Sequence, residues 1–281
     1  MRTSFWDVVG KQANLKTEMQ YLETMFCGKI FYCYSTKYDL ISYINSYYFS
    51  NWAAKNRITC PTIWDLRSRI GIDRLKVNWQ LSIDEFLLYL ECTVNLINLI
   101  PKNDQNIIAV EISKHMLSNI RTNCDRLNFE IVKFSEGCLK IVEKNAATTA
   151  VADKYAESDS DFSYKVIEYN HFLLKGNVGR KREILKAIAD KFEAVRPQLK
   201  ANGFGAVESD AGYLVNNLNI RHNNTDPQSR SHNAYVAGMQ DAELEKWYDR
   251  TYDVLLLALL ASDFSELHSD IQELKKKIGA K

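Results

Sequence analysis

The chain has 281 residues, of which 46% are hydrophobic and 25% charged, and its formal net charge at pH 7 is +1. This is the composition of an ordinary globular protein, and the length suits two domains. The near-zero charge excludes a global field for a polyanion, so any contact with nucleic acid must come from a local patch. With only 11 glycines and 4 prolines, long helices are favoured over many short strands and turns.

The six cysteines form no Cys-x-x-Cys pair, and no Cys/His grouping has zinc spacing, so we expect free thiols and no metal or cofactor. The segment Met1–Asp7 lacks the apolar core of a signal peptide. The longest apolar run, residues 254–261, is far below the roughly 18 residues that span a bilayer. These features predict a cytoplasmic protein that does not enter a membrane.

Helical spacing of apolar residues begins with the set from Met19 to Tyr34, whose aromatic side chains are expected in a helical core. The segment Cys60–Thr62 precedes a short expected helix. Ser82–Glu85 has the pattern of a capping box and opens a helix that ends before Pro101. Apolar residues at every fourth position from Ile108 to Ile120 predict another amphipathic helix.

The predicted fold class is all-α, with one small β-hairpin. The segments 129–134 and 139–142 are rich in β-branched and aromatic residues, which indicates two short strands. Small and polar residues at 146–152, followed by the acidic run 157–161, indicate a boundary. We therefore expect an aromatic-rich helical domain over residues 1–150 and a helical bundle over residues 151–281.

Four helices and a tail are expected in the second domain. The first covers about 162–173 with Gly176 after its end, and the second covers 184–199 with Pro197 kinking or ending its last turn. The third is expected from Ser209 to Arg221, and the fourth around 244–259 with Asp241 as its N-cap. A short charged helix is expected over 264–277.

Five asparagines crowd the segment from Asn216 to Asn224. Asparagine is a poor helix former, and local misfits of this kind gather at functional sites. Asn217 and Arg221 are four residues apart, so a continuous helix would place both on one face, where a cation flanked by amides suits a phosphate. The alternative is that the basic side chain and the asparagines only cap the helix end.

Histidine and further basic residues follow directly. His222 is adjacent to Arg221, and the next loop holds Arg230 and His232; imidazole is the side chain that titrates near neutral pH. The helix 180–200 carries seven basic and three acidic residues, a balance of 7 − 3 = +4. Such a face suits RNA phosphates, or is simply the solvated side of an amphipathic helix.

The tetrapeptide Ile220-Arg-His-Asn223, placed between two amphipathic helices, resembles the signature region of HEPN domains. These are helical bundles found in prokaryotic toxins and abortive-infection proteins that act in phage defence. The similarity covers roughly residues 161–262, and it also includes the segments Glu168–His171, Leu218–Asn224 and Leu244–Asp249. The resemblance implies a four-helix bundle in the second domain and a homodimer.

The resemblance further implies metal-independent cleavage of RNA, with roles for individual residues. Arg221 would stabilise the developing charge, and His222 or His232 would act as general base or acid. The residues implied in substrate binding are Asn217, Asn223, Asn224 and Arg230. The residues implied in supporting them are Asn170, His171 and Asp226.

Two alternatives stay open beside the ribonuclease. The family's histidine position corresponds here to Asp226, Pro227 or Gln228, which favours a non-catalytic HEPN-like module that binds RNA, a nucleotide or a protein. The aromatic first half favours a helical scaffold, in which the segment from Asn217 to Arg221 would serve only structure.

Overall fold

A computed structural model describes residues 14–56, 58–77, 80–134 and 137–279. Over these residues the protein is mainly helical, 68% helix, with two small two-stranded antiparallel hairpins, which confirms the coarse prediction of a helical fold with a small hairpin. The chain divides into two compact units, Met1–Ile141 and Val142–Lys281. No helix among the described residues is long and apolar enough to cross a membrane.

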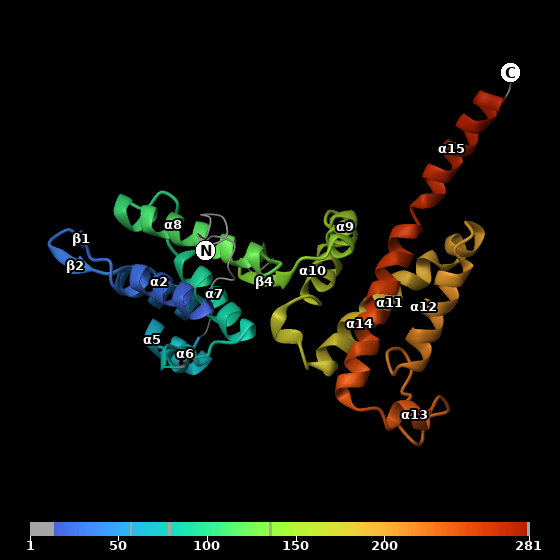
Figure 1. The fold of residues 1–281 in the computed structure, drawn as a ribbon, viewed down its shortest axis with the longest axis horizontal. Coiled ribbons are helices and arrows are strands. Elements are labelled where there is room, and N and C mark those ends of the chain that lie inside the picture. The colour runs from blue at the N-terminus through green and yellow to red at the C-terminus, as the bar shows by residue number, and fades with distance from the viewer. Residues whose placement is uncertain (1–13, 57, 78–79, 135–136, 280–281) are drawn as a thin grey trace, which may run out of the picture. The chain divides into compact units, whose positions relative to one another are not determined.

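The first unit packs three longer helices, α2, α7 and α8, with shorter ones around them (Figure 1). Its helices are α2 (Leu15–Cys27), α3 (Leu40–Ile44), α4 (Ser50–Lys55), α5 (Ile63–Ile70), α6 (Ile72–Val77), α7 (Ile83–Ile97) and α8 (Ile107–Arg126), with a π-helical turn η1 (Asn45–Phe49) between α3 and α4. Its strands are β1 (Phe31–Cys33), β2 (Thr36–Tyr38) and β3 (Phe129–Lys133), and β4 (Leu139–Glu143) crosses into the second unit.

The helix expected through Tyr34 ends at Cys27, so that prediction is wrong beyond this point. Gly28 closes α2, and the chain turns into the antiparallel hairpin β1–β2. Tyr34 adopts a φ of +53° in the tight turn and is exposed. The apolar spacing that favours a helix is therefore shared by two different elements.

Helix starts in the first unit follow their sequence signals closely. The capping box at Ser82 is confirmed, because its hydroxyl accepts from the Glu85 amide and the glutamate accepts from the Ser82 amide. Thr62 and Asp65 form a second capping box at the start of α5. The hairpin expected over 129–142 is also confirmed as β3–β4, although residues 135 and 136 lie outside the described residues.

A cluster of charged and polar groups around buried Arg67 joins four helices of the first unit, α2, α5, α6 and α7. Arg67 on α5 is only 2% exposed, and one of its guanidinium nitrogens lies 2.9 Å from each carboxylate oxygen of Glu23 on α2. Tyr89 on α7 donates to the same carboxylate at 3.1 Å, and Lys76 lies 2.8 Å from it. Burial of an ion pair costs desolvation, so the four groups depend on one another for their stability.

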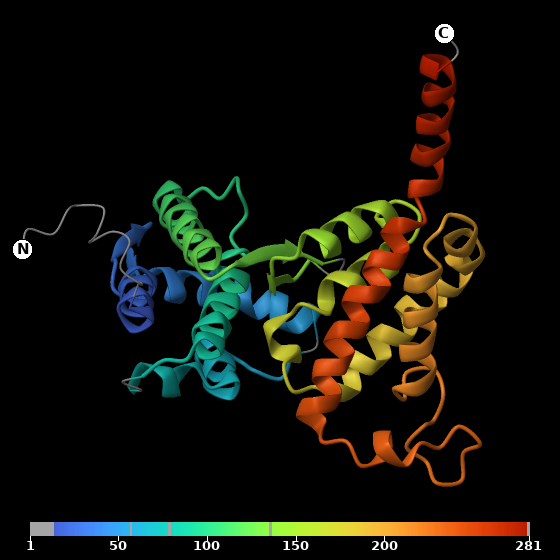
Figure 2. The same cartoon turned by 45° about the vertical axis from the view of Figure 1, so that its right-hand side comes forward.

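The second unit contains the helices α9 (Ala146–Tyr155), α10 (Ser160–Glu168), α11 (Val178–Ala201), α12 (Gly205–Asn217), α13 (Ala234–Ala237), α14 (Asp241–Ala261) and α15 (Phe264–Gly279), with a 3₁₀ turn η2 (Phe172–Leu174) before α11. Helices α11, α12 and α14 lie side by side (Figures 1 and 2). Their shared core includes Ile188, Phe192, Val215, Tyr248 and Leu255.

The division expected at residue 150 falls inside α9. Asn145 caps this helix by accepting from the amides of Ala147 and Thr148. Val151 and Ala152 then pack in the core of the second unit. The small side chains that resemble a linker in the sequence instead allow close packing of α9 against its neighbours.

Helix α11 runs through Pro197 to Ala201, so of the two effects expected of the proline, a kink or an end, the end does not occur. Other helix termini differ from their predicted positions. The N-cap of α14 is Gln240, and Asp241 is the first helical residue. Helix α12 ends at Asn217, four residues before the predicted end at Arg221, and this last difference changes the geometry of the candidate site.

Candidate functional site

Helix α12 ends because Asn219 adopts a left-handed conformation. Its φ is +56°, a region that asparagine tolerates better than most residues. The chain then folds back, and the Arg221 amide donates to the Val215 carbonyl at 3.1 Å. Asn217 and Arg221 therefore do not share a helical face, so that geometric prediction is wrong. The side-chain amide of Asn217 donates to the Tyr213 carbonyl of its own helix at 2.8 Å.

Two asparagines hold the loop that follows, residues 218–233, in a closed shape. The Asn219 amide donates to the Asn224 side-chain oxygen at 2.9 Å, and the Asn224 amide donates to the Asn219 side-chain oxygen at 3.1 Å. The Asn224 side chain also donates to the Ser231 carbonyl at 2.8 Å, and its own carbonyl accepts from Asn233 at 2.8 Å. Asn224 is 2% exposed, so this side chain serves the shape of the loop.

Arg221 connects the 218–233 loop to α11. Its guanidinium lies 2.6 Å from the Glu193 carboxylate and 3.9 Å from Asp190, and its side chain is 30% exposed. Glu193 also accepts from Arg196 at 3.0 Å. Arg182 strengthens the connection by donating to the Asn219 carbonyl. The predicted cation is thus held in an ion pair at the protein surface and is not turned freely into an open site.

The other predicted polar residues of the loop lie at its surface. His222, Asn223, Arg230 and His232 are exposed. Among the described residues, no hydrogen bond joins Arg221 to either imidazole. Asp226 accepts from the Asn223 side chain at 3.3 Å and from the Gln228 amide at 2.9 Å, which orders the tip of the loop.

Asn170 and His171 belong to a different part of the unit. The Asn170 side chain donates to Thr148 at 2.7 Å and to the Tyr252 hydroxyl at 3.3 Å. His171 is buried, forms a backbone bridge with Val142, and packs its ring on Phe172 with centroids 4.9 Å apart. These contacts link α9, β4 and α14. The ion-pair partners of Arg221, in contrast, lie on α11.

The basic residues of α11 are largely neutralised within the protein. The partners are Glu168 and Glu183 for Arg180, Glu245 and Asp249 for Lys181, Asp159 for Lys191, and Glu193 and Glu208 for Arg196. Cations that are already paired attract a phosphate much less strongly than the net charge of +4 along this helix implies.

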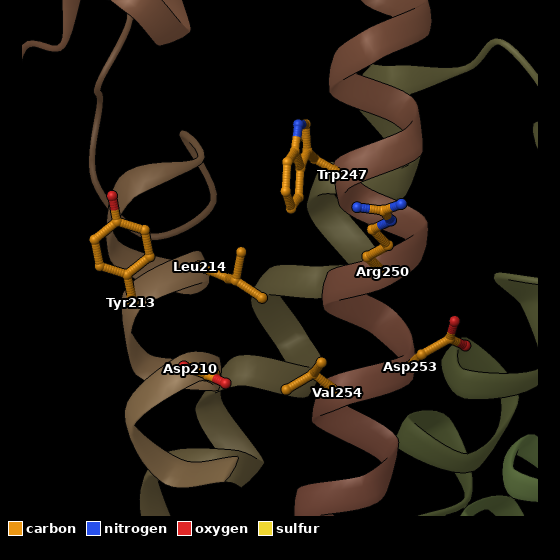
Figure 3. A pocket seen from close by; sticks show the side chains of 7 residues that line it. All are labelled: Asp210, Tyr213, Leu214, Trp247, Arg250, Asp253 and Val254. Atoms are coloured by element: carbon orange, nitrogen blue, oxygen red, sulfur yellow. The ribbon is translucent and has the colours of Figure 1, made fainter. Parts of the chain in front are cut away.

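A groove lies between α12 and α14, the two helices that the 218–233 loop and α13 connect. Its volume is about 500 Å³, and it is lined by Asp210, Tyr213, Leu214, Trp247, Arg250, Asp253 and Val254. Figure 3 shows Tyr213 on α12 and Trp247 on α14 standing on opposite sides, with Leu214 and Val254 pointing across between the helices.

Aromatic and charged groups meet in this α12–α14 groove. Trp247 packs partly on the core, and the Arg250 guanidinium lies 5.0 Å from its ring centre. Tyr213 is 66% exposed. Burial, followed by the nearby Asp249, raises the pKa of Asp253. The sequence predicts Trp247 on the apolar face of its helix. It does not predict the groove, because the two helices that form its walls are far apart along the chain.

A second hollow, of about 480 Å³, lies in the first unit and is lined mainly by tyrosines. Tyr43 and Tyr48 both donate to the Asp104 carboxylate, Tyr43 at 2.9 Å. Burial and the hydrogen bonds to Asp104 raise the pKa of both tyrosines, that of Tyr48 to about 12. The π-helical turn η1 supplies Tyr47 and Tyr48, and such turns are frequent at functional sites.

The described residues contain no group of three or more His, Cys, Asp or Glu side chains that could hold a metal ion. Comparison of the chain with family models, with curated proteins and with solved structures gives no match. Its function must therefore be inferred from the geometry of its own residues.

Proposed function

We propose that the second unit binds single-stranded RNA, as the HEPN-like segment implies for a module without the family's histidine. The 218–233 loop would contact the phosphates, and the α12–α14 groove would hold a base. Unstacked bases bind proteins by stacking on aromatic rings and guanidinium planes, while basic side chains follow the backbone.

The observation that carries the proposal is the pairing of Trp247 and Arg250 in a groove that Tyr213 borders on its other side. The groove has room for a planar group between the two helices. Asp210 and Asp253 offer acceptors to the amino groups of a base. Two carboxylates against one guanidinium do not attract phosphate, so the groove suits the base and the adjoining loop suits the backbone.

The loop supports the proposal because its shape is fixed before a ligand arrives. The reciprocal hydrogen bonds of Asn219 and Asn224 hold the base of the loop. The side chains of His222, Arg230 and His232 are exposed on its surface. A preorganised loop loses less conformational entropy on binding than a flexible one. To bind a phosphate, Arg221 would have to give up its ion pair with Glu193. This competition limits the affinity of the loop for RNA.

The stacking part of the proposal is tested by binding of a labelled single-stranded RNA to the full chain, measured by fluorescence anisotropy. Trp247→Ala should weaken binding about tenfold, because loss of one base–aromatic stack costs roughly 1–3 kcal/mol. Trp64→Ala is the matched control, because Trp64 is 46% exposed on α5 of the first unit. If Trp247→Ala and wild type bind the RNA with equal affinity, the groove is not the site that holds a base.

The phosphate part is tested by the salt dependence of the same binding. For single strands, each phosphate contact contributes about 0.7 to the slope of log affinity against log salt. Arg230→Ala should lower that slope by about this amount, with little change in preference among bases. A slope that is zero for wild type would exclude phosphate contacts altogether.

RNA cleavage is the second candidate function, and the observation that favours it is the exposure of two imidazoles on the loop that carries Arg221. One imidazole would take the proton of the ribose 2′-hydroxyl, whose oxygen attacks the adjacent phosphorus. The other would protonate the departing 5′-oxygen, leaving a 2′,3′-cyclic phosphate. Cleavage of RNA by wild type in the presence of a chelator, and its loss in His222→Ala or His232→Ala, would support this candidate. If the RNA stays intact with wild type, the module binds RNA without cleaving it.

A further inference from the structure

Helix α15 carries an apolar stripe that the second unit leaves exposed. Its first residue, Phe264, packs edge-to-face on Phe204 with ring centres 5.6 Å apart, which anchors the base of the helix. From there α15 extends away from α11, α12 and α14 (Figures 1 and 2). Leu267, Leu274 and Ile278 are 55%, 56% and 67% exposed, values that are high for apolar side chains of a regular helix.

The spacing of this stripe is that of a coiled coil. Leu267, Ile271, Leu274 and Ile278 follow one another at intervals of four, three and four residues. This places the isoleucines at a positions and the leucines at d positions of a heptad. Branched isoleucine at a with leucine at d favours two parallel strands over higher assemblies.

The charges beside the stripe also fit a second copy of the same helix. In this register Asp270 takes a g position and Lys275 the e position of the following heptad. In a parallel pair, a g residue of one helix faces the e residue five positions later on the other. Asp270 and Lys275 would therefore attract each other twice, once in each direction. Within one helix they are five residues apart, so they do not face each other.

We propose that α15 pairs in parallel with α15 of a second copy of this chain. The seam from Leu267 to Ile278 spans less than two heptads, so the association is weak and depends on concentration. Pairing covers the stripe of Leu267, Ile271, Leu274 and Ile278 and brings the second units of two chains together at the bases of their α15 helices. This dimer does not require the RNA-binding proposal, and it is measured without RNA.

The first test is sedimentation velocity of the full chain over a range of concentrations. Wild type should pass from the mass of one chain to the mass of two, and Leu274→Asp should remain a single chain. Because Leu274 is exposed, its replacement leaves the core of the unit unchanged. Lys276→Gln is the control, since it alters the net charge by the same amount outside the seam. A wild type that stays single, or a Leu274→Asp variant that pairs like wild type, would overturn the proposal.

The second test uses charge exchange to establish the parallel register. Asp270→Lys and Lys275→Asp should each weaken the dimer roughly tenfold, because like charges then face each other twice. The double variant Asp270→Lys/Lys275→Asp should restore it, since both attractions return with their signs reversed. Failure of restoration would exclude the parallel pair. Binding of α15 to anionic lipid vesicles by a protein that never pairs in solution would also exclude it.

Discussion

The guanidinium of Arg221 lies 2.6 Å from the carboxylate of Glu193, and this ion pair helps to join the 218–233 loop to α11. Glu193 shares its charge with Arg196 as well. The arginine is thus neither buried nor free. In the proposed RNA-binding module, a phosphate would compete with Glu193 for this guanidinium.

Glu193→Gln should therefore strengthen RNA binding. Removal of the competing carboxylate leaves Arg221 able to donate to phosphate, while Arg196 keeps its pair with Glu208. A gain of several-fold in affinity at low salt is expected. Fluorescence anisotropy with the RNA used for wild type measures it. Glu183→Gln is the matched control, because Glu183 is exposed on the same helix and pairs with Arg180. An unchanged affinity in Glu193→Gln would show that Arg221 does not contact the phosphates.

Asn224→Ala should open the 218–233 loop while the helices stay folded. The variant removes two side-chain hydrogen bonds and leaves the Asn219 amide and the Ser231 carbonyl without partners, at a cost of about 1–3 kcal/mol. Hydrogen exchange should accelerate within the loop and remain slow in α14. Asn223→Ala, which removes an exposed bond of 3.3 Å to Asp226, should change neither. Equal protection of the loop in both variants would contradict this role.

Glu23→Gln should destabilise the first unit by about 3–5 kcal/mol, because it leaves the guanidinium of Arg67 buried without a counter-charge. Chemical denaturation of wild type and variant measures the difference. The control is Glu18→Gln, whose pair with Arg126 is longer, 3.5 Å, and partly exposed, so its loss costs about 1 kcal/mol or less. Similar losses in the two variants would contradict the dependence on burial.

The same carboxylate predicts a loss of stability in acid. Burial alone would raise the pKa of Glu23, but Arg67 and Lys76 outweigh it and hold the pKa below the ordinary value of 4.5. The stabilisation is therefore complete above that value and is lost as the pH falls through the lowered pKa of the folded state. Thermal unfolding at a series of acid pH values should show this loss in wild type. If the melting temperature of Glu23→Gln falls with pH as steeply as that of wild type, the loss of stability comes from other groups.

Tyr248→Phe should stabilise the second unit. The hydroxyl of Tyr248 is fully buried and has no hydrogen-bond partner among the described residues, and burial raises its pKa to about 12. Its removal relieves an unpaired polar group, which is worth about 1 kcal/mol or more. Tyr252→Phe, in contrast, should destabilise, because its hydroxyl donates to Val166 at 2.8 Å. A lower melting temperature in Tyr248→Phe would indicate a partner such as a buried water.

Capping boxes predict helix starts well, whereas apolar spacing predicts helix ends poorly. The capping box at Ser82 needs only four consecutive residues, so it is visible in the sequence. The end of α12 depends on the left-handed conformation of Asn219, and α2 ends at Gly28, after which the chain enters the β1–β2 hairpin. Apolar spacing continues through both points, and for that reason it overestimates the length of each helix.

The candidate site shows the same limit at longer range. The unusual composition of the 218–233 loop identifies it as a region of interest, but the pairing of Arg221 with Glu193 joins residues on separate elements. The groove has the same property, since Tyr213 and Trp247 lie on different helices. Contacts of this kind depend on how helices pack, which periodicity within one segment does not encode.

The bonds of Asn224 to Ser231 and Asn233 close the 218–233 loop at its base and leave residues 225–230 outside the closure. The tip can therefore change in length or sequence at little entropic cost, because its two ends stay fixed at the same separation. In the proposed RNA-binding module, exchange of that short stretch would alter the contacts of the loop while the helical scaffold is kept intact.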